Sequence, residues 1–295
     1  MEQRTRIGIV GIGAMGMAMA THLQRRGHSP RVRDIDPALV AAAVAQGMPA
    51  FDSAAALAAG CDLVAIVVVD AAQIDDVLFG AGGVVHAPPR SEPLTVMLCS
   101  TIAAHETERF RDALAAHSIA LLDAPISGGP VRAANGSMSM MLAGDRLLFE
   151  RFEPLLREMA GTLFYIGETV GDAARTKLVN NLLAGINLVA GAEALALGAR
   201  LGLDKRALLE VIKASSGASW IVTDRMARAL EADYVPRART VILTKDVGLA
   251  VQMADAAGVD TPLGDVALRL FQAAVAAGLG ELDDAAVIRS ICPDF

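Results

Sequence analysis

The fold of this chain is decided by the stretch Arg6-Ile7-Gly8-Ile9-Val10-Gly11-Ile12-Gly13-Ala14-Met15-Gly16. A short β-rich run leads into three glycines with Gly-x-Gly-x-x-Gly spacing, and a helical pattern continues from Met17. Gly11 allows a tight turn out of the strand, Gly13 lets the backbone approach a pyrophosphate, and Gly16 lets the helix pack closely on the sheet. The stretch therefore predicts a dinucleotide-binding unit, in which the amino end of the helix offers N–H groups to the phosphates.

A second strand-like run, Pro30-Arg-Val-Arg-Asp34, supports this prediction. Asp34 lies eighteen residues beyond Gly16, close to the roughly 20 residues expected for the acid that binds the adenosine ribose hydroxyls. We predict NAD as the cofactor, with Asp34 at the ribose and the phosphates at Gly11, Ile12, Gly13, Ala14, Met15 and Gly16. The alternative role for Asp34 is a solvated strand end or the cap of the helix that starts at Pro37, which Asp36 could cap instead.

Strand and helix patterns alternate through the first half of the chain, and helix formers dominate after Gly167. Near-continuous apolar runs such as Leu63–Val69 are typical of parallel strands buried on both faces. We predict an α/β fold, with an N-terminal Rossmann-type doubly wound sheet in residues 1–166 and a C-terminal all-helical domain in residues 167–295. The expected strands are Arg6–Val10, Arg31–Asp34, Asp62–Val69, Leu94–Ser100, Ile119–Leu122 and Met138–Leu142, and the alternating pattern ends near Leu163-Phe-Tyr-Ile166. The expected helices of the second domain are Ala173–Leu201, Lys205–Ser215, Trp220–Glu231, Val241–Ala257 and Thr261–Ala277.

The composition argues against a nucleic-acid-binding, a metal-binding or a membrane-spanning protein. The net charge of −7 argues against a nucleic-acid partner, which normally requires a basic face. The three cysteines and five histidines have no metal-ligand or redox spacing, so we expect no metal and a reducing, cytoplasmic compartment. We also expect no membrane span, because the apolar stretch after Leu178 is interrupted by Asn180, Asn181, Asn187 and Glu193.

Two groups of polar residues are candidates for binding a substrate. In Asp123-Ala-Pro-Ile-Ser127-Gly128-Gly129, the hydroxyl and the unobstructed glycine N–H groups suit a carboxylate, although such a sequence also forms ordinary turns. In Lys177-Leu-Val-Asn180-Asn181, Lys177 and Asn181 share one helix face, which either addresses a substrate or faces solvent. Asparagines are poor helix formers, so we expect their side chains to have a compensating partner.

These motifs resemble those of the β-hydroxyacid dehydrogenase family over nearly the whole chain. The resemblance rests on the glycine loop, Ser100-Thr101, Asp123–Gly129, Lys177 with Asn180-Asn181, and Lys245-Asp246. It implies an NAD-dependent oxidoreductase with Lys177 as the catalytic general acid/base, Asn181 and Ser127, Gly128 and Gly129 holding the substrate, and Thr101 and Lys245 lining the cofactor site. To act as a base, the lysine needs a pKa below its ordinary value of about 10.4, which partial burial and a nearby positive nicotinamide would favour.

Segments of the helical half look most like the L-threonate dehydrogenase branch of this family: Ser216-Gly-Ala-Ser-Trp220, Tyr234-Val-Pro-Arg237 and Asp283-Asp-Ala-Ala-Val-Ile-Arg289. The expected substrate is a short hydroxy acid, a four-carbon sugar acid such as L-threonate, with Trp220 and Arg237 near its far end. The alternative for Trp220 is packing in the helical core. The resemblance and the apolar helical domain also suggest a homodimer or homotetramer.

Other functions stay open at this point. One is 3-hydroxyisobutyrate dehydrogenase activity, and another is NADPH-dependent reduction of tartronate semialdehyde, succinic semialdehyde or glyoxylate. An imine reductase typically lacks the lysine found here at Lys177. A non-catalytic nicotinamide-binding protein would not need Lys177, Asn181 and Ser127 together.

Overall fold

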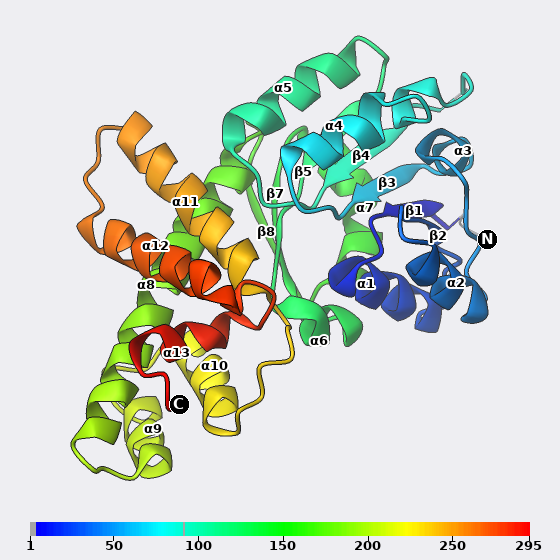
Figure 1. Ribbon diagram of the computed structural model, residues 1–295. Coiled ribbons are helices and arrows are strands. Elements are labelled where there is room, and N and C mark those ends of the chain that lie inside the picture. The colour runs from blue at the N-terminus through cyan, green and yellow to red at the C-terminus, as the bar shows by residue number, and fades with distance from the viewer. Residues whose placement is uncertain (1–3, 91) are drawn as a thin grey trace. The chain divides into compact units, whose positions relative to one another are not determined.

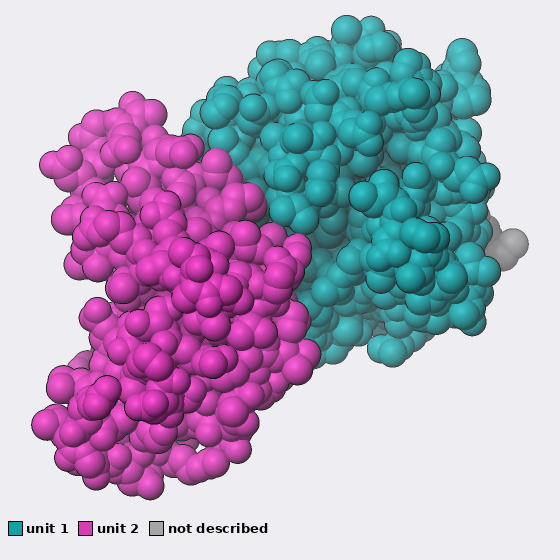
Figure 2. Space-filling view, viewed as in Figure 1, with its two compact units in different colours: residues 1–177 teal, residues 178–295 magenta. Residues whose placement is uncertain are grey.

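The computed structural model describes residues 4–90 and 92–295 (Figure 1). The chain divides into two compact units, the first ending at Lys177 and the second running from Leu178 to Phe295 (Figure 2). The boundary expected at residue 166 lies one residue before the end of the last strand, at Gly167, whereas the observed division lies within helix α8, Asp172–Arg200. The first turn of α8 belongs to the first unit because the Asp123 carboxylate accepts hydrogen bonds from Gly171 N and Ala174 N.

The first unit is built on one eight-stranded sheet with the order β2-β1-β3-β4-β5-β7-β6, and β8 also pairs with β7. Strands β1 to β5 are parallel, β7 runs antiparallel to β5 and β6, and β8 is parallel to β7. The strands are β1 Ile7–Val10, β2 Arg31–Arg33, β3 Leu63–Ile66, β4 Thr95–Leu98, β5 Ala120–Asp123, β6 Ile126–Ser127, β7 Ser139–Ala143 and β8 Thr162–Gly167. The predicted Rossmann-type sheet is confirmed, with the two-residue strand β6 as an addition.

Helices cover both faces of this sheet, and the strand residues alternate accordingly. Leu63 and Ala65 of β3 join one apolar core, whereas Val64 and Ile66 join the other, as expected for a strand buried on both faces. The helices are α1 Ala14–Arg25, α2 Pro37–Ala45, α3 Ala54–Ala58, α4 Ala71–Phe79, α5 Ala104–Ala115, α6 Gly129–Ala134 and α7 Arg146–Met159, with the short 3-10 helix η1 at Val84–His86.

The second unit consists of helices around one apolar core, as predicted. Glycines let neighbouring helices approach α8, since a Cβ on Gly185 would lie 2.5 Å from a Val247 methyl and one on Gly191 would lie 2.6 Å from a Val222 methyl. After α8 come α9 Lys205–Lys213, α10 Trp220–Leu230, α11 Thr240–Ala256, α12 Pro262–Ala274, the π-helical turn η2 Val275–Leu279, the 3-10 helix η3 Asp284–Ala286 and α13 Val287–Ile291.

Helix α8 is long and apolar enough to cross a membrane by length and composition, although no such segment was expected from the sequence. It is the one such helix in residues 4–90 and 92–295. A central helix of a helical unit meets the same criterion, and Leu188, Ala192 and Leu195 of α8 lie in the apolar core. The criterion alone therefore gives no membrane assignment.

Candidate active site

The glycine loop between β1 and α1 has the geometry that its sequence predicts. Gly11 adopts φ +88°, and a Cβ there would lie 2.5 Å from the Val67 carbonyl oxygen. A Cβ on Gly16 would lie 1.9 Å from the Gly11 carbonyl oxygen, so only glycine allows the helix to start this close to the turn. At Gly13, by contrast, nothing lies within 4 Å of the place that a Cβ would take, which leaves the backbone open to a ligand.

The amino end of α1 suits a pyrophosphate. Gly13 is the N-cap residue, and no side chain caps the helix. The first-turn N–H groups of a helix have no intrahelical partners, so those of Ala14, Met15 and Gly16 could donate to an anion at this end of the helix. The donor set and the open space at Gly13 fit a dinucleotide cofactor.

Asp34 lies beside this loop at the carboxyl end of β2. Its Oδ2 accepts a hydrogen bond from Ile12 N at 2.7 Å, and its Oδ1 accepts one from Asp36 N at 2.9 Å. The N-cap of α2 is Asp36, whose side chain accepts a hydrogen bond from Ala38 N. The capping role considered for Asp34 is therefore excluded, and its carboxylate is fixed against the glycine loop.

Ser100 and Thr101 follow β4 at the same edge of the sheet. The Ser100 hydroxyl donates to Val68 O at 2.7 Å and lies 3.2 Å from Val68 N. This buried contact joins the loops that follow β3 and β4. Thr101 is half-buried directly beyond it.

Ser127 ends β6, and Gly128 and Gly129 lead into α6. The two glycines have φ values of +128° and +71°, which other residues rarely adopt. A Cβ on Gly128 would meet the Arg132 side chain at 3.0 Å, whereas nothing lies within 4 Å of one on Gly129. The turn therefore has an open side with the half-buried Ser127 at its start.

Asp123, at the start of the same motif, has a structural task. It is buried, and its Oδ2 accepts hydrogen bonds from Gly171 N at 2.9 Å and from Ala174 N at 3.1 Å. The carboxylate thus caps α8, the helix that carries Lys177. Burial raises the pKa of Asp123 to about 6, although the backbone N–H donors act in the opposite direction.

This raised pKa predicts a pH-dependent stability. The ordinary carboxyl pKa is 3.8, so between about pH 4 and 6 the folded protein binds the proton more tightly than the unfolded chain, and the free energy of unfolding falls as pH rises. The contribution is about 3 kcal/mol. Asp123→Asn should lack this decrease, which urea unfolding at a series of pH values would measure. Asp145→Asn, which alters the exposed N-cap of α7, is the matched control, and equal pH slopes in wild type and Asp123→Asn would contradict the prediction.

Lys177 and Asn181 stand one turn apart on α8, and both are buried, with exposed fractions of 6% and 7%. The Asn181 amide Nδ2 donates to Asp246 Oδ2 at 2.7 Å, and Asn180 Nδ2 donates to Asn181 Oδ1 at 3.1 Å. The alternative that Lys177 and Asn181 form a solvated helix face is therefore wrong. The two asparagines thus have the compensating partners that their position in a helix predicts. Asp246 fixes the orientation of the Asn181 amide, and Asn181 in turn binds Asn180.

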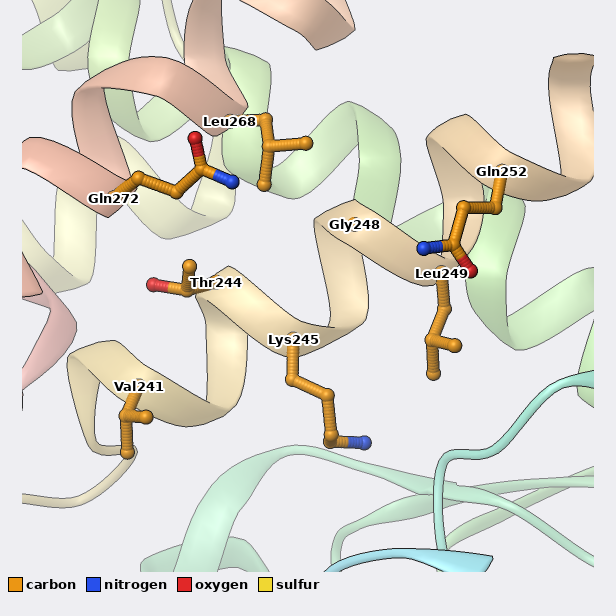
Figure 3. A pocket seen from close by; sticks show the side chains of 8 residues that line it. All are labelled: Val241, Thr244, Lys245, Gly248, Leu249, Gln252, Leu268 and Gln272. Carbon is orange, nitrogen blue, oxygen red and sulfur yellow. The ribbon is translucent and has the colours of Figure 1, made fainter.

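Lys245 and Asp246 lie on α11. Lys245 Nζ lies 2.8 Å from Asp246 Oδ1. Lys245 also borders a pocket of about 410 Å³ between α11 and α12, but Figure 3 shows its side chain extending away from Leu268 and Gln272 on the opposite wall. The pocket lining is mainly apolar and contains no carboxylate, so its chemistry does not match that of a catalytic site.

No role for Asp246 was predicted from the sequence. The helical spacing contains a signal for such a role. Leu243, Val247 and Ala250 form the buried stripe of α11, and Asp246 falls on the same stripe. A carboxylate in such a position needs a polar partner because its burial is costly. Among residues 4–90 and 92–295, no three His, Cys, Asp or Glu side chains are grouped as metal ligands.

The structure also places the segments that resemble the L-threonate branch. Trp220 is 55% exposed, so the alternative that it packs in the helical core is wrong. Arg237 lies in a loop, and its backbone N–H donates to Oδ2 of the fully buried Asp283 at 2.7 Å. The same carboxylate oxygen forms an ion pair with Nη1 of Arg228 at 2.7 Å. This buried pair holds the Tyr234–Arg237 loop against α10.

Comparison with known proteins identifies the family. Residues 6–167 match the family model described as the NAD binding domain of 6-phosphogluconate dehydrogenase, and residues 171–291 match the model described as NAD-binding of NADP-dependent 3-hydroxyisobutyrate dehydrogenase. The L-threonate dehydrogenase of Escherichia coli (strain K12) is 40% identical over 287 residues, covering 96% of this chain and 93% of the relative. The 3-hydroxyisobutyrate dehydrogenase of Pseudomonas aeruginosa is 35% identical, covering 90% and 91%.

A solved structure agrees with these matches. The crystal structure of a 3-hydroxyisobutyrate dehydrogenase from Salmonella typhimurium superposes with a TM-score of 0.88 at 38% identity, covering 97% of this chain and 99% of the other. Sequence and fold thus agree over almost the full length. The chain belongs to the β-hydroxyacid dehydrogenase family and is a nicotinamide-dependent dehydrogenase that acts on a CH–OH group.

Proposed function

We propose that this protein oxidises a short hydroxy acid with NAD, and that the substrate is a four-carbon sugar acid such as L-threonate. The observation that carries the reaction is the buried Lys177 one helical turn before Asn181, whose amide is fixed by Asp246. The substrate rests on relatives named L-threonate dehydrogenase, which are 35–40% identical over 96–98% of this chain.

In this proposal each residue group has a separate task. The Ser127 hydroxyl and the N–H groups of Gly128 and Gly129 bind the substrate carboxylate. Asn181 orients Lys177. The neutral Lys177 amine removes the proton from the substrate hydroxyl while the carbon that carries this hydroxyl loses its hydride. A bound nicotinamide supplies the hydride acceptor. Gly11, Ile12, Gly13, Ala14, Met15 and Gly16 hold the cofactor phosphates, Asp34 its ribose, and Thr101 and Lys245 line its site.

A second candidate is 3-hydroxyisobutyrate oxidation, favoured by the 35% identical relative and by the Salmonella typhimurium structure. The experiment that tests the proposal is a screen of C3–C6 hydroxy acids and sugar acids with NAD and with NADP, followed by the absorbance of the reduced nicotinamide. The proposal predicts oxidation of L-threonate with NAD. Absence of turnover with every acid of the panel would contradict it.

Asp34 should make the enzyme prefer NAD over NADP. The ribose phosphate of NADP would approach a carboxylate that Ile12 N and Asp36 N already hold in place, and like charges repel. We expect kcat/KM with NAD to exceed that with NADP by more than about tenfold, because a repulsion of about 1.4 kcal/mol is sufficient for that ratio.

Asp34→Asn should reduce this ratio, and Asp36→Asn is the matched control because it removes a neighbouring charge that caps α2. Steady-state kinetics with both cofactors measure the effect. Equal or better efficiency of the wild type with NADP would reject Asp34 as the selecting residue.

We also propose a homodimer or homotetramer in a reducing, cytoplasmic compartment. Support for an oligomer comes from apolar side chains exposed on two helices of the second unit, namely Val179, Leu183 and Leu197 of α8 and Leu263 and Val266 of α12. The three cysteines are buried free thiols, as suits a reducing compartment. Light scattering after gel filtration would give the oligomeric state, and a monomer at micromolar concentration would contradict the first part.

A further inference from the structure

A second pocket lies in the first unit, at the amino ends of β1 and β2. These two strands are neighbours in the sheet (Figure 1). The glycine loop and Asp34 follow their opposite, carboxyl ends. The pocket has a volume of about 400 Å³, within the range of small-ligand sites. It is lined by Arg4, Thr5, Arg6, Ile7, Gly27, His28, Ser29, Arg31, Pro49 and Phe51. Three arginines and no carboxylate are among these residues, in a chain whose net charge is −7.

Arg31 of this pocket is packed between Phe51 and Gly60. Its guanidinium lies over the Phe51 ring, 5.0 Å from the ring centroid. A Cβ on Gly60 would lie 2.1 Å from Arg31 Nη1, so the absence of a side chain at Gly60 leaves room for the guanidinium. Within residues 4–90 and 92–295, no carboxylate lies at ion-pair distance from Arg31. A guanidinium fixed in this way loses little conformational freedom when it binds an anion.

The other charges around the pocket leave it positive. Asp62 is shared by Arg6 and by Arg90, at 2.6 and 3.4 Å. Glu158 is shared by Arg26 and His28, each at 3.3 Å. Both carboxylates therefore already have two partners, and neither is among the lining residues.

We propose that this pocket binds a small organic phosphate, with the phosphate at Arg31 and Arg4 and a flat ring or apolar group against Phe51. Guanidinium groups match phosphate oxygens in pairs, and aromatic rings and arginine planes stack on flat ligands. The site is distinct from the cofactor loop, because β1 separates them by four residues, or about 13 Å of strand. Binding should therefore not compete with the nicotinamide cofactor.

The test is isothermal titration of pyrophosphate and of AMP into the full-length protein saturated with NAD, so that the glycine loop is already occupied. We expect binding of both probes at one site per chain. Arg31→Gln should weaken it about ten- to a hundredfold, the usual range for hydrogen bonds to a charged group. Gly60→Ala should weaken it without any change of charge, because the new methyl displaces the Arg31 guanidinium. Arg111→Gln, an exposed position on α5, is the control and should leave binding unchanged.

The melting temperature and the NAD affinity of each variant establish that it is folded. Tighter binding of AMP than of pyrophosphate would indicate that the adenine ring contacts Phe51. Equal binding would indicate that the pocket recognises only the phosphate group. Both results would support the proposal. Absence of binding at millimolar concentrations, or binding that Arg31→Gln and Gly60→Ala leave unchanged, would overturn it. The dehydrogenase assay is independent of this result, so the proposed reaction and this site can fail separately.

Discussion

Replacing Lys177 with alanine is expected to lower kcat by about two to four orders of magnitude, the usual range for loss of a general acid/base. The buried amine is the group proposed to take the hydroxyl proton, and Asn181 stands one turn away to orient it. Alanine leaves no side chain in this position that can accept a proton. The residues proposed to hold the cofactor lie elsewhere, so NAD affinity should change little.

The measurement combines steady-state kinetics with isothermal titration of NAD. Lys213→Ala removes a lysine that pairs with Glu210 on the surface of α9, and it should leave both quantities unchanged. Lys177→Ala that keeps more than about a tenth of the wild-type turnover would show that Lys177 is not the general acid/base.

Ser127→Ala should lower kcat/KM by about ten- to a hundredfold while NAD affinity stays constant. The change removes one hydrogen bond to a charged carboxylate, which contributes about 1.5–3 kcal/mol. The turn itself should survive, because its shape depends on the positive φ angles of Gly128 and Gly129 and not on the serine side chain.

Ser139 provides the matched control, since it pairs with Ser127 across β6 and β7. Its hydroxyl reaches only the Ser127 carbonyl oxygen, at 3.5 Å, which is a weak contact. Ser139→Ala should therefore leave kcat/KM within about threefold of wild type. A Ser127→Ala enzyme with wild-type kcat/KM would remove Ser127 from the carboxylate site.

Much of this architecture follows from local sequence patterns. The glycine spacing predicts both the tight turn at Gly11 and the close contact at Gly16, because backbone sterics alone require glycine there. The all-helical second half is predicted well because its helices are long and punctuated by glycines. The two-residue strand β6 could not be predicted, since two residues have no periodicity to detect.

Contacts between distant segments explain the remaining differences. The helical spacing predicts that Lys177 and Asn181 share one face, but only the fold brings Asp246, 65 residues after Asn181, to the Asn181 amide. The unit boundary lies inside α8 because Asp123 binds the first turn of that helix. The exposure of Trp220 depends on how α10 packs, which its own sequence does not determine.

The central claim is tested most directly by the kcat/KM values of the wild-type enzyme for L-threonate and for 3-hydroxyisobutyrate, measured with NAD under identical conditions. A site built to bind extra hydroxyls leaves its buried polar groups unpaired when an apolar analogue binds. The account therefore predicts that L-threonate is the better substrate by more than about tenfold. Equal or higher efficiency with 3-hydroxyisobutyrate would contradict the assignment to a sugar acid, while membership of the dehydrogenase family would stand.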